Sequence, residues 1–448
     1  MTYGVFEPLL EERSYDVTEI DGTVPLDLRG ALYRNGPGKW QVGTTLLDCL
    51  FDGDGMVSRF AFDQGRVSFR NRYLDTPQYR AKRRWRAGVG TSAGFPMPPA
   101  NTANTSLSFH SGDLLALWEG GRPTRVDPDT LDTYGLHGFE GGLKGLGMWS
   151  AHPRFDPATG EMFNFGLRFA PTPGVHCYRV DRSGKLTRAA SVRLKGIPWI
   201  HDFGLTERHM VFVLGPATPD VGRILRGDSA LSALHYRPEN PLRFLLVPRD
   251  GGPARIVEHD AAMATHITNA YEDGTDTVVE VVAYPDFTLL KEDILNFRDR
   301  AHQARPNSLT RYRITPSRVV EERLSEHACE LPQFDQRAST RRHRYSYLSG
   351  SHAASGLFDA VLKVDHDTEE VTSRPLGDCV GEPVFVPRAP DSAEDDGWLL
   401  SVVYQEAGHR SGLAVLDARD LGLLATAWLP HHIPFGFHGL FTGRLPRT

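Results

Sequence analysis

Short runs of hydrophobic residues recur along the whole chain, and turn-forming residues separate them. Some runs alternate apolar and polar side chains, as strands with one buried face do, and others are continuously apolar over the length of a strand. Four clear runs are Val67–Tyr73, Glu161–Phe165, Val211–Leu214 and Val278–Ala283. This pattern predicts a protein built mainly of short β-strands.

Residues that favour tight turns lie between the apolar runs. Segments 127–130, 156–160, 181–184 and 249–252 read Asp-Pro-Asp-Thr, Asp-Pro-Ala-Thr-Gly, Asp-Arg-Ser-Gly and Arg-Asp-Gly-Gly. Such compositions are typical of hairpin turns, because Gly, Pro and Asp accept the backbone angles that turns require. Many short strands joined in this way indicate a sandwich, a barrel or a propeller.

Helical patterns are few. The clearest covers Phe287 to Gln303 and has Asp286 as a candidate N-cap, and a second covers Arg223 to Leu234. Gly (44 residues) and Pro (31) are spread through the 448 residues instead of gathering in linkers, so the sequence marks no domain boundary. We therefore expect a single domain over residues 1–448.

Charge and cysteine content exclude several functional classes. A net charge of -6 gives no electrostatic basis for binding nucleic acid, which requires a basic surface. The four cysteines lack any Cys-x-x-Cys spacing, which argues against a zinc knuckle or a disulfide scaffold and fits a reducing compartment. Neither a secretory signal nor an apolar run of membrane-spanning length is visible. We expect a cytoplasmic protein that at most touches a membrane surface.

Isolated polar residues recur at a spacing that favours the propeller. The gaps between His152, His201, His266, Glu330, Glu382 and His438 are 49, 65, 64, 52 and 56 residues. A four-stranded blade takes about 40–50 residues, and more when its loops are long. One inward-pointing residue per blade would produce this spacing, and the chain length then suggests seven blades.

The four histidines of this set are candidate metal ligands. Neutral imidazole suits iron, copper, zinc and nickel, and four neutral ligands leave the full charge of a divalent metal and some coordination positions free. That combination suits an Fe(II) centre that binds dioxygen. Glu119, Glu330 and Glu382 lie in apolar surroundings and could accept the second ring N–H of the histidines.

The simpler alternative is that each histidine is an ordinary surface or core residue, as a histidine taken alone usually is. We assign this reading to the histidines at positions 137, 176, 209, 235, 259, 327, 343, 431 and 432. The glutamates could likewise be solvated residues beside turns. Asp52-Gly53-Asp54-Gly55 invites a calcium interpretation but lacks the remainder of an EF-hand loop, so a tight turn is expected there.

Ordered motifs along nearly the whole chain decide between these alternatives. They include Leu32-Tyr-Arg-Asn-Gly-Pro37, Phe51-Asp-Gly-Asp-Gly-Met56, Ala103-Asn-Thr105, Leu114 to Gly120, His152 to Pro157, His201-Asp-Phe203, His266 to Glu272, Glu330-Leu-Pro332, Glu382-Pro383 and His438-Gly439. In content and order they resemble the motifs of the carotenoid cleavage oxygenase family.

The resemblance implies a seven-bladed β-propeller with Fe(II) on its axis and a cap of loops and helix over the iron-bearing face. By the matching motifs, the iron ligands would be His152, His201, His266 and His438. Glu119, Glu330 and Glu382 would orient His201, His266 and His438, while His152 has no such partner. Thr105 matches the residue whose methyl group crowds the vacant metal position and helps to steer dioxygen.

The resemblance also implies oxidative cleavage of a C=C bond of an apolar polyene by dioxygen, giving two carbonyl products. Trp118 favours carotenoid or apocarotenoid substrates, because stilbene-cleaving relatives place a phenol-binding lysine there. Within the family, the alternatives are a stilbene cleaver and an iron-containing isomerase. Outside the family, the alternative is a non-catalytic binding platform.

Relatives commonly have an aromatic residue where this chain has Thr265, so we expect a differently shaped substrate channel. The Arg223–Leu234 segment matches an apolar, membrane-resting entrance, but it carries Arg223 and Arg226, so a solvated helix is its alternative.

Overall fold

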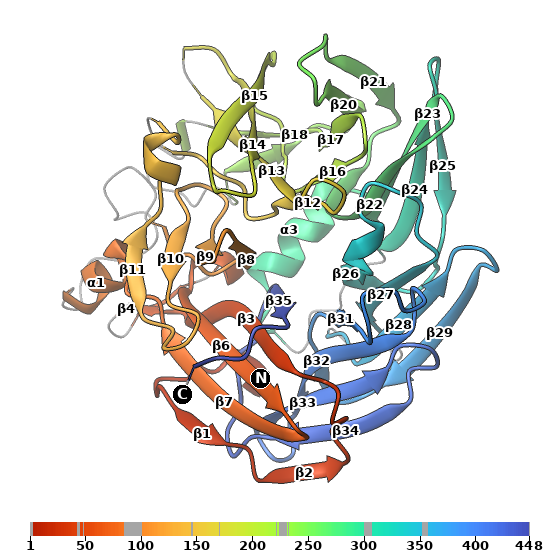
Figure 1. Ribbon diagram of the computed structural model, residues 1–448. Helices are drawn as coiled ribbons and strands as arrows, with labels where there is room; N and C mark the ends of the chain where they lie inside the picture. Colours follow the sequence, from red (N-terminus) through yellow and green to blue (C-terminus); the bar gives the residue numbers. More distant parts are fainter. Residues whose placement is uncertain are drawn as a thin grey trace.

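The chain folds into a ring of seven antiparallel sheets, which are the blades of a β-propeller (Figure 1). The computed structural model describes residues 3–42, 45–47, 49–84, 101–144, 147–169, 171–220, 222–223, 231, 233–299, 307–351 and 357–447. The seven-bladed architecture expected from the sequence is confirmed.

In each blade, the innermost strand lies at the axis of the ring and the outermost strand lies at its rim. From the axis outward, blade 1 contains β35 (Gly439–Thr442), β3 (Gly30–Lys39), β6 (Asp54–Asp63), β7 (Arg66–Tyr73) and β1 (Ser14–Asp16). Blade 2 contains β8 (Ser106–His110), β9 (Asp113–Leu117), β10 (Thr124–Val126) and β11 (Thr133–Leu136). Blade 3 contains β12 (Arg154–Asp156), β13 (Glu161–Arg168), β14 (Gly174–Val180) and β15 (Leu186–Arg193).

The remaining blades follow the same plan. Blade 4 contains β16 (Phe203–Leu205), β17 (His209–Leu214), β20 (Leu242–Pro248) and β21 (Arg255–His259). Blade 5 contains β22 (Met263–Asp273), β23 (Asp276–Tyr284), β24 (Ser308–Ile314) and β25 (Val319–Arg323). Blade 6 contains β26 (Cys329–Phe334), β27 (Tyr345–Gly350), β28 (Ala360–Asp365) and β29 (Glu370–Pro375). Blade 7 contains β30 (Cys379–Val380), β31 (Val384–Pro387), β32 (Gly397–Gln405), β33 (Arg410–Asp417), β34 (Leu423–Trp428) and β2 (Glu19–Gly22).

Hydrophobic patterning explains the position of each strand within its blade. The middle strands are sandwiched between two neighbouring blades, so β23 is buried at nearly every position. The outermost strands face solvent, and β29 and β25 are accordingly mostly exposed. The four strands and four hairpin turns expected from the sequence are present, the strands as β7, β13, β17 and β23. Their ends differ by only a few residues from the expected ones.

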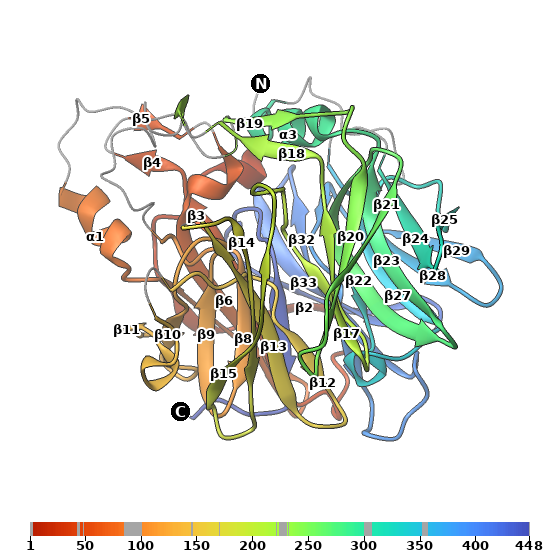
Figure 2. The same cartoon turned by 90° about the horizontal axis from the view of Figure 1, so that it is seen from above.

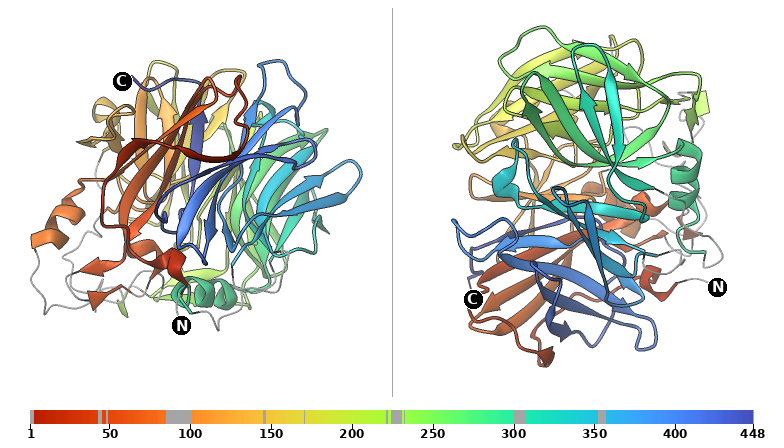
Figure 3. Two further views of the ribbon diagram at one scale, coloured as in Figure 1. Left: turned by 90° about the horizontal axis from the view of Figure 1, so that it is seen from below. Right: turned by 90° about the vertical axis from the view of Figure 1, so that its right-hand side faces the viewer.

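Both ends of the chain close the ring. Near the N-terminus, β2 pairs with β34 of the last blade, with Glu19 opposite Trp428. Near the C-terminus, β35 pairs with β3 of the first blade, with Ala31 opposite Thr442. Figure 3 shows these red and blue segments side by side in both views. Separating blades 1 and 7 would therefore break backbone hydrogen bonds in two sheets.

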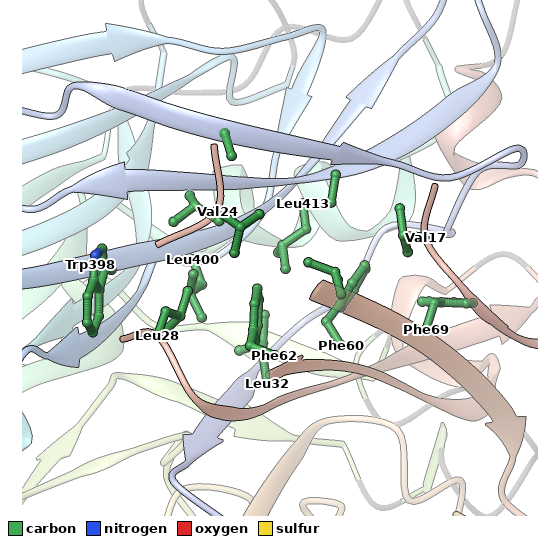
Figure 4. Packing of buried hydrophobic residues seen from close by; sticks show 14 of the residues in the cluster. Val17, Val24, Leu28, Leu32, Phe60, Phe62, Phe69, Trp398, Leu400 and Leu413 are labelled. Atoms are coloured by element: carbon green, nitrogen blue, oxygen red, sulfur yellow. The ribbon is translucent and has the colours of Figure 1, made fainter. Parts of the chain in front are cut away.

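A hydrophobic cluster fills the space between the first and last blades (Figure 4). Phe60 and Phe62 of β6 face Leu400 of β32 and Leu413 of β33, and all four side chains are fully buried. Burying a side chain of this size contributes about 1.5–3 kcal/mol. The closure therefore rests on side-chain packing as well as on strand pairing.

Short elements cover one end of the ring, as Figure 2 shows. They are helix α3 (Phe287–Leu295) and the two-stranded pairs β4 (Gln41–Val42) with β5 (Thr45–Leu46) and β18 (Ala217–Pro219) with β19 (Leu234–Tyr236). Helix α1 (Pro77–Arg84) lies to one side, and short 3-10 turns occur at Gly4–Phe6, Leu50–Asp52, Phe139–Gly141 and Gln336–Ala338. No helix in the described ranges is long and apolar enough to cross a membrane.

Of the two helices expected from the sequence, the one after Asp286 is present but shorter than expected, and most of the other lies outside the described residues. Helix α3 begins directly after Asp286, as expected, but it ends at Leu295. At Asn296 the backbone N–H and the side-chain amide both donate to Glu292 O at 2.9 Å, which satisfies the last turn. Residues 300–303 of the expected helix lie outside the described residues. The same holds for residues 224–230 and 232 of the expected Arg223–Leu234 helix, and Leu234 itself begins β19.

Candidate metal centre

Each of the seven blades brings one polar residue to a cluster around the central axis. From blade 2 to blade 7 and then blade 1, these residues are Thr105, His152, His201, His266, Glu330, Glu382 and His438. His266 and Glu330 lie inside β22 and β26, and the other five lie one or two residues before their innermost strand. The regular spacing of these residues along the chain is thus the spacing of the blades.

The four histidines converge on one point. The Nε2 atom of His201 lies 3.1 Å from the Nε2 atoms of both His152 and His266. The ring of His438 lies 4.8 Å from that of His152 and 4.7 Å from that of His266, measured between centroids. One nitrogen from each ring falls within 4.8 Å of all the others. Two imidazole nitrogens bound at right angles to one metal ion are about 3 Å apart, so the spacing fits a shared ion.

Three of the four histidine rings each have their own glutamate carboxylate next to Nδ1. Glu119 Oε1 lies 2.9 Å from His201 Nδ1, and Glu382 Oε1 lies 2.9 Å from His438 Nδ1. His266 Nδ1 donates to Glu330 Oε2. Around His152, the only described carboxylate within reach is Glu119, at 3.9 Å from Nε2. Three histidines therefore have a carboxylate behind them and the fourth does not.

These carboxylates fix which ring nitrogen carries the proton. A histidine that donates its Nδ1–H to a carboxylate has an unprotonated Nε2 with a lone pair. His201 and His266 accordingly point two lone pairs at each other across 3.1 Å. Two lone pairs at that distance repel, unless a cation lies between them. The donor set therefore fits a divalent metal ion bound by neutral imidazoles.

Burial and neighbouring charges define the ionisation of the cluster. Burial opposes the ionisation of Glu330 and Glu382, but His266 in one case and Arg34 with His438 in the other hold both pKa values at about 2. Burial and the surrounding imidazoles hold the pKa of His152 well below its usual range. Burial also lowers the pKa of His438. For His201, the Glu119 carboxylate outweighs burial and raises the pKa.

Two bulges aim the site residues of blades 5 and 6. Ala264 pairs with Ala283 and Ile267 with Val281, so Thr265 and His266 together oppose the single residue Val282. A bulge of this kind turns side chains away from the regular alternation of a strand. A second irregularity follows Glu330 in β26, where Leu331 has a φ of 56°. Left-handed backbone at a bulky residue costs energy and is typical of functional sites.

Two arginines to which sequence reasoning assigned no role, buried Arg34 and half-buried Arg154, support the cluster. Arg34 of β3 donates to Glu382 and, at 2.8 Å, to the carbonyl of Phe437. On the other side, Asp202 accepts from Arg154 at 2.5 Å and from the backbone N–H of Ile267 at 2.8 Å. The second network joins β12, β16 and β22 directly beside three of the histidines. Both arginines lie in the quoted motifs, but their partners are distant in the chain and no local pattern reveals them.

Other residues singled out in the sequence also lie near this cluster. Thr105 precedes β8, and its carbonyl accepts the backbone N–H of His438 at 3.2 Å. Thr265 is buried, and its hydroxyl donates to Glu330 Oε1 at 2.6 Å. The ring of Trp199 is stacked 6.1 Å from that of His201 and contacts Phe287 of α3. Helix α3 therefore covers the histidine-bearing side of the ring.

A second group of metal-binding residue types lies between blades 5 and 6. Glu280, His343 and His366 are fully buried, and one ligand atom of each lies within 4.8 Å of the others. Ser346 Oγ lies 2.8 Å from the Nε2 atoms of both histidines, and Glu280 Oε2 lies 3.4 Å from His343 Nε2.

The proton positions in this second group oppose metal binding. His343 Nδ1 faces the Asn269 side-chain amide at 3.2 Å, and His366 Nδ1 faces a guanidinium nitrogen of Arg311 at 3.3 Å. Both partners are N–H donors, so each Nδ1 accepts and each Nε2 carries the proton. These histidines therefore point N–H groups, not lone pairs, at Glu280 and Ser346. His343 and His366 therefore surround the buried Glu280 carboxylate, and we call this group the Glu280 cage. The sequence analysis had interpreted His343 as an ordinary histidine, and it has no metal-binding role here.

Comparison with known proteins identifies the family. The family model described as retinal pigment epithelial membrane protein matches residues 6–443. The apocarotenoid-15,15'-oxygenase of Synechocystis is 34% identical over 96% of this chain and 93% of its own length. The resveratrol cleavage oxygenase 1 of Aspergillus fumigatus is 30% identical over 97% of this chain and 94% of its own length.

A solved structure agrees with these matches. Cobalt-substituted apocarotenoid oxygenase of Synechocystis superimposes with a TM-score of 0.89 at 32% identity, covering 98% of each chain. The cobalt substitution means that this relative holds a metal ion. A family model that spans nearly the whole chain, together with relatives that match it over 93% or more of their own length, supports a single family assignment. The chain belongs to the carotenoid cleavage oxygenase family, to which retinal pigment epithelial membrane protein also belongs.

Proposed function

We propose that the protein is a non-haem Fe(II) dioxygenase that cleaves a C=C bond of a carotenoid or apocarotenoid into two carbonyl products. The observation that carries the proposal is the converging set of four histidines, three of them with a carboxylate behind the ring, in a chain of this family. A binding platform offers no reason for such a set, because imidazole lone pairs that converge at one buried point repel one another unless a bound cation compensates them.

The residues of the cluster divide into two roles. His152, His201, His266 and His438 would hold the iron through Nε2, and Glu119, Glu330 and Glu382 would fix the tautomer and orientation of the last three. Iron bound there would supply the redox chemistry that activates dioxygen. The chain itself supplies position: bond selection would follow from where the ring of blades holds the polyene, without an acid–base residue.

Thr105 is proposed to shape the space beside the metal. Its hydroxyl lies 3.3 Å from Asn104 Oδ1, and its backbone N–H donates to Leu117 O at 3.0 Å. The hydroxyl contact restricts the side-chain rotamer and the backbone bond holds the residue in place, so the methyl group is the part of Thr105 proposed to restrict access to the metal. That placement is consistent with a role in steering dioxygen.

The substrate preference is proposed to depend on Trp118. This half-buried indole directly precedes Glu119, the carboxylate next to His201. An indole offers an apolar face to a polyene, whereas a phenolic substrate would favour a charged or hydrogen-bonding residue there. A hydroxystilbene substrate remains the second candidate, because a relative of similar length is a resveratrol cleavage oxygenase.

An assay of the iron-loaded protein on both substrate classes tests the proposal. Apocarotenoids should be split into two carbonyl products, and hydroxystilbenes should be turned over poorly or not at all. His266→Ala serves as the control for uncatalysed oxidation. Turnover of stilbenes alone would contradict the carotenoid assignment, and isomerised but uncleaved polyene would favour the isomerase alternative.

The proposed setting is the cytoplasm, with dioxygen and an apolar polyene as the small-molecule partners and without nucleic acid. The four buried cysteines are free thiols, which fits a reducing compartment. The net charge of -6 argues against a nucleic-acid partner. A single domain over residues 1–448 and weak contact with a membrane surface also remain part of the proposal.

A further inference from the structure

Glu330 receives more hydrogen bonds than orientation of His266 alone would need. Its Oε2 accepts from His266 Nδ1 and, at 2.7 Å, from the backbone N–H of Leu331. Its Oε1 accepts from the Thr265 hydroxyl at 2.6 Å and from the Tyr284 hydroxyl at 3.4 Å. Each carboxylate oxygen is thus held by two donors, and the side chain has a single orientation that satisfies all four.

The three carboxylates of the site are supported in different ways. Glu382 is paired with the guanidinium of Arg34, so a full positive charge compensates it. The Glu119 side chain is about one-third exposed, at 36%, and water can reach it. Glu330 is buried, and the three groups that donate to it besides His266 are all neutral. Because a neutral donor leaves the carboxylate charge in place, Glu330 pulls more strongly on the His266 N–H than Glu382 does on that of His438.

Thr265 owes its position to the bulge in β22. In a regular strand, adjacent residues point to opposite faces, and Thr265 would face away from His266. Because both residues oppose Val282, the Thr265 hydroxyl reaches the same carboxylate as the His266 ring. The aromatic residue that the family resemblance leads one to expect at this place would have no hydroxyl near its backbone to offer Glu330.

We propose that Thr265, assisted by Tyr284, is a positioning residue that locks the Glu330 carboxylate and thereby sets the orientation and donor strength of His266. This inference rests on the proposed metal centre, which it deepens, but not on the identity of the substrate. Without the hydroxyl, Glu330 Oε1 would keep only the long contact to Tyr284, and the carboxylate could rotate away from His266. The metal would then lose part of the support behind one of its four ligands.

The pair Thr265→Val and Thr265→Ser tests this proposal. Valine removes the hydroxyl at nearly constant shape, and serine keeps the hydroxyl while it removes the methyl group. Metal-free protein is titrated with Co(II), and both the dissociation constant and the visible absorption spectrum are recorded. We expect Thr265→Val to weaken Co(II) binding about tenfold or more and to alter the spectrum. Thr265→Ser should bind as the unmodified protein does, and Tyr284→Phe should fall between the two.

Thermal unfolding of the metal-free variants separates a structural role from a positioning role. A structural role would lower the melting temperature of Thr265→Val and leave Co(II) binding unchanged, which would overturn the proposal. Equal weakening in the valine and serine variants would also overturn it, since the hydroxyl would then not be responsible. An unmodified protein that binds no metal would overturn both this proposal and the metal centre. Thr265-dependent binding without cleavage of any polyene would leave this proposal standing and contradict the proposed function.

Discussion

Arg34 and Glu382 form an ion pair buried directly behind His438, with side-chain exposures of 5% and 1%. Arg34 comes from β3, at the start of the chain, whereas Glu382 precedes β31 and His438 precedes β35. The pair therefore ties the candidate metal centre to the closure of the ring between blades 1 and 7. Stability and metal binding should be linked through this contact.

Replacing Arg34 by methionine should be strongly destabilising. The change leaves the Glu382 carboxylate buried without its cation, and breaking one partner of a buried ion pair costs about 3–5 kcal/mol. Urea unfolding of the metal-free protein measures this loss. Arg34→Lys is the matched control, since it keeps the charge but loses the fork that also reaches the Phe437 carbonyl. Equal stability of Arg34→Met and the unmodified protein would show that the pair contributes nothing.

Replacing His343 by alanine should leave bound metal unchanged. His343 and His366 point N–H groups at Glu280, because their Nδ1 atoms face the donors Asn269 and Arg311. The Glu280 cage should therefore matter for stability alone, and the variant should unfold more easily. Metal analysis of the purified variant, together with thermal unfolding, checks both parts. A second equivalent of metal in the unmodified protein, lost on this substitution, would refute the proton assignment.

Glu272 should make stability depend on acid pH. It accepts hydrogen bonds from Thr206 at 2.7 Å, Arg208 at 2.8 Å and His209 at 2.9 Å. Although burial opposes its ionisation, these partners lower the pKa of Glu272 from 4.5 to about 2. A carboxyl whose pKa falls on folding stabilises the protein above its unfolded-state pKa. That stabilisation is lost as the pH falls from about 4.5 to about 2.

The test compares the unmodified protein with Glu272→Gln. The free energy of unfolding of the unmodified protein should drop more steeply than that of the variant between about pH 5 and about pH 3, because the carboxyl at position 272 titrates there and the glutamine that replaces it does not. Glutamine keeps the size and one acceptor oxygen. Parallel curves for the two proteins would mean that Glu272 has the same pKa in the folded and unfolded chains.

The sequence predicted those features of the fold that repeat. Alternating or continuously apolar runs located β7, β13, β17 and β23, and the spacing of single histidines and glutamates indicated one residue per blade. The expected helix was too long at its C-terminal end: α3 stops at Leu295, where the side-chain amide of Asn296 bonds back to Glu292 O, and the apolar pattern alone does not mark that position. Pattern reasoning works where a rule acts on neighbouring residues, and it fails where one side chain decides.

Long-range partners could not be predicted at all. Arg34 reaches Glu382 across 348 positions of sequence, and Arg154 reaches Asp202 across 48. Thr265 stood out in the sequence only as a departure from an aromatic residue. Its contact with Glu330 depends on the bulge in β22, for which the sequence carries no turn signal. Such contacts arise only when the blades are placed side by side.

Metal binding by the four axial histidines underlies both the proposed function and the role of Thr265. The decisive measurement is the iron content of anaerobically purified protein, compared with that of His266→Ala and of His343→Ala as a matched buried-histidine control. We predict near-stoichiometric iron in the unmodified protein and in His343→Ala, and its loss in His266→Ala. Absence of iron from the unmodified protein, or iron that is indifferent to His266, would contradict the assignment of these histidines as ligands.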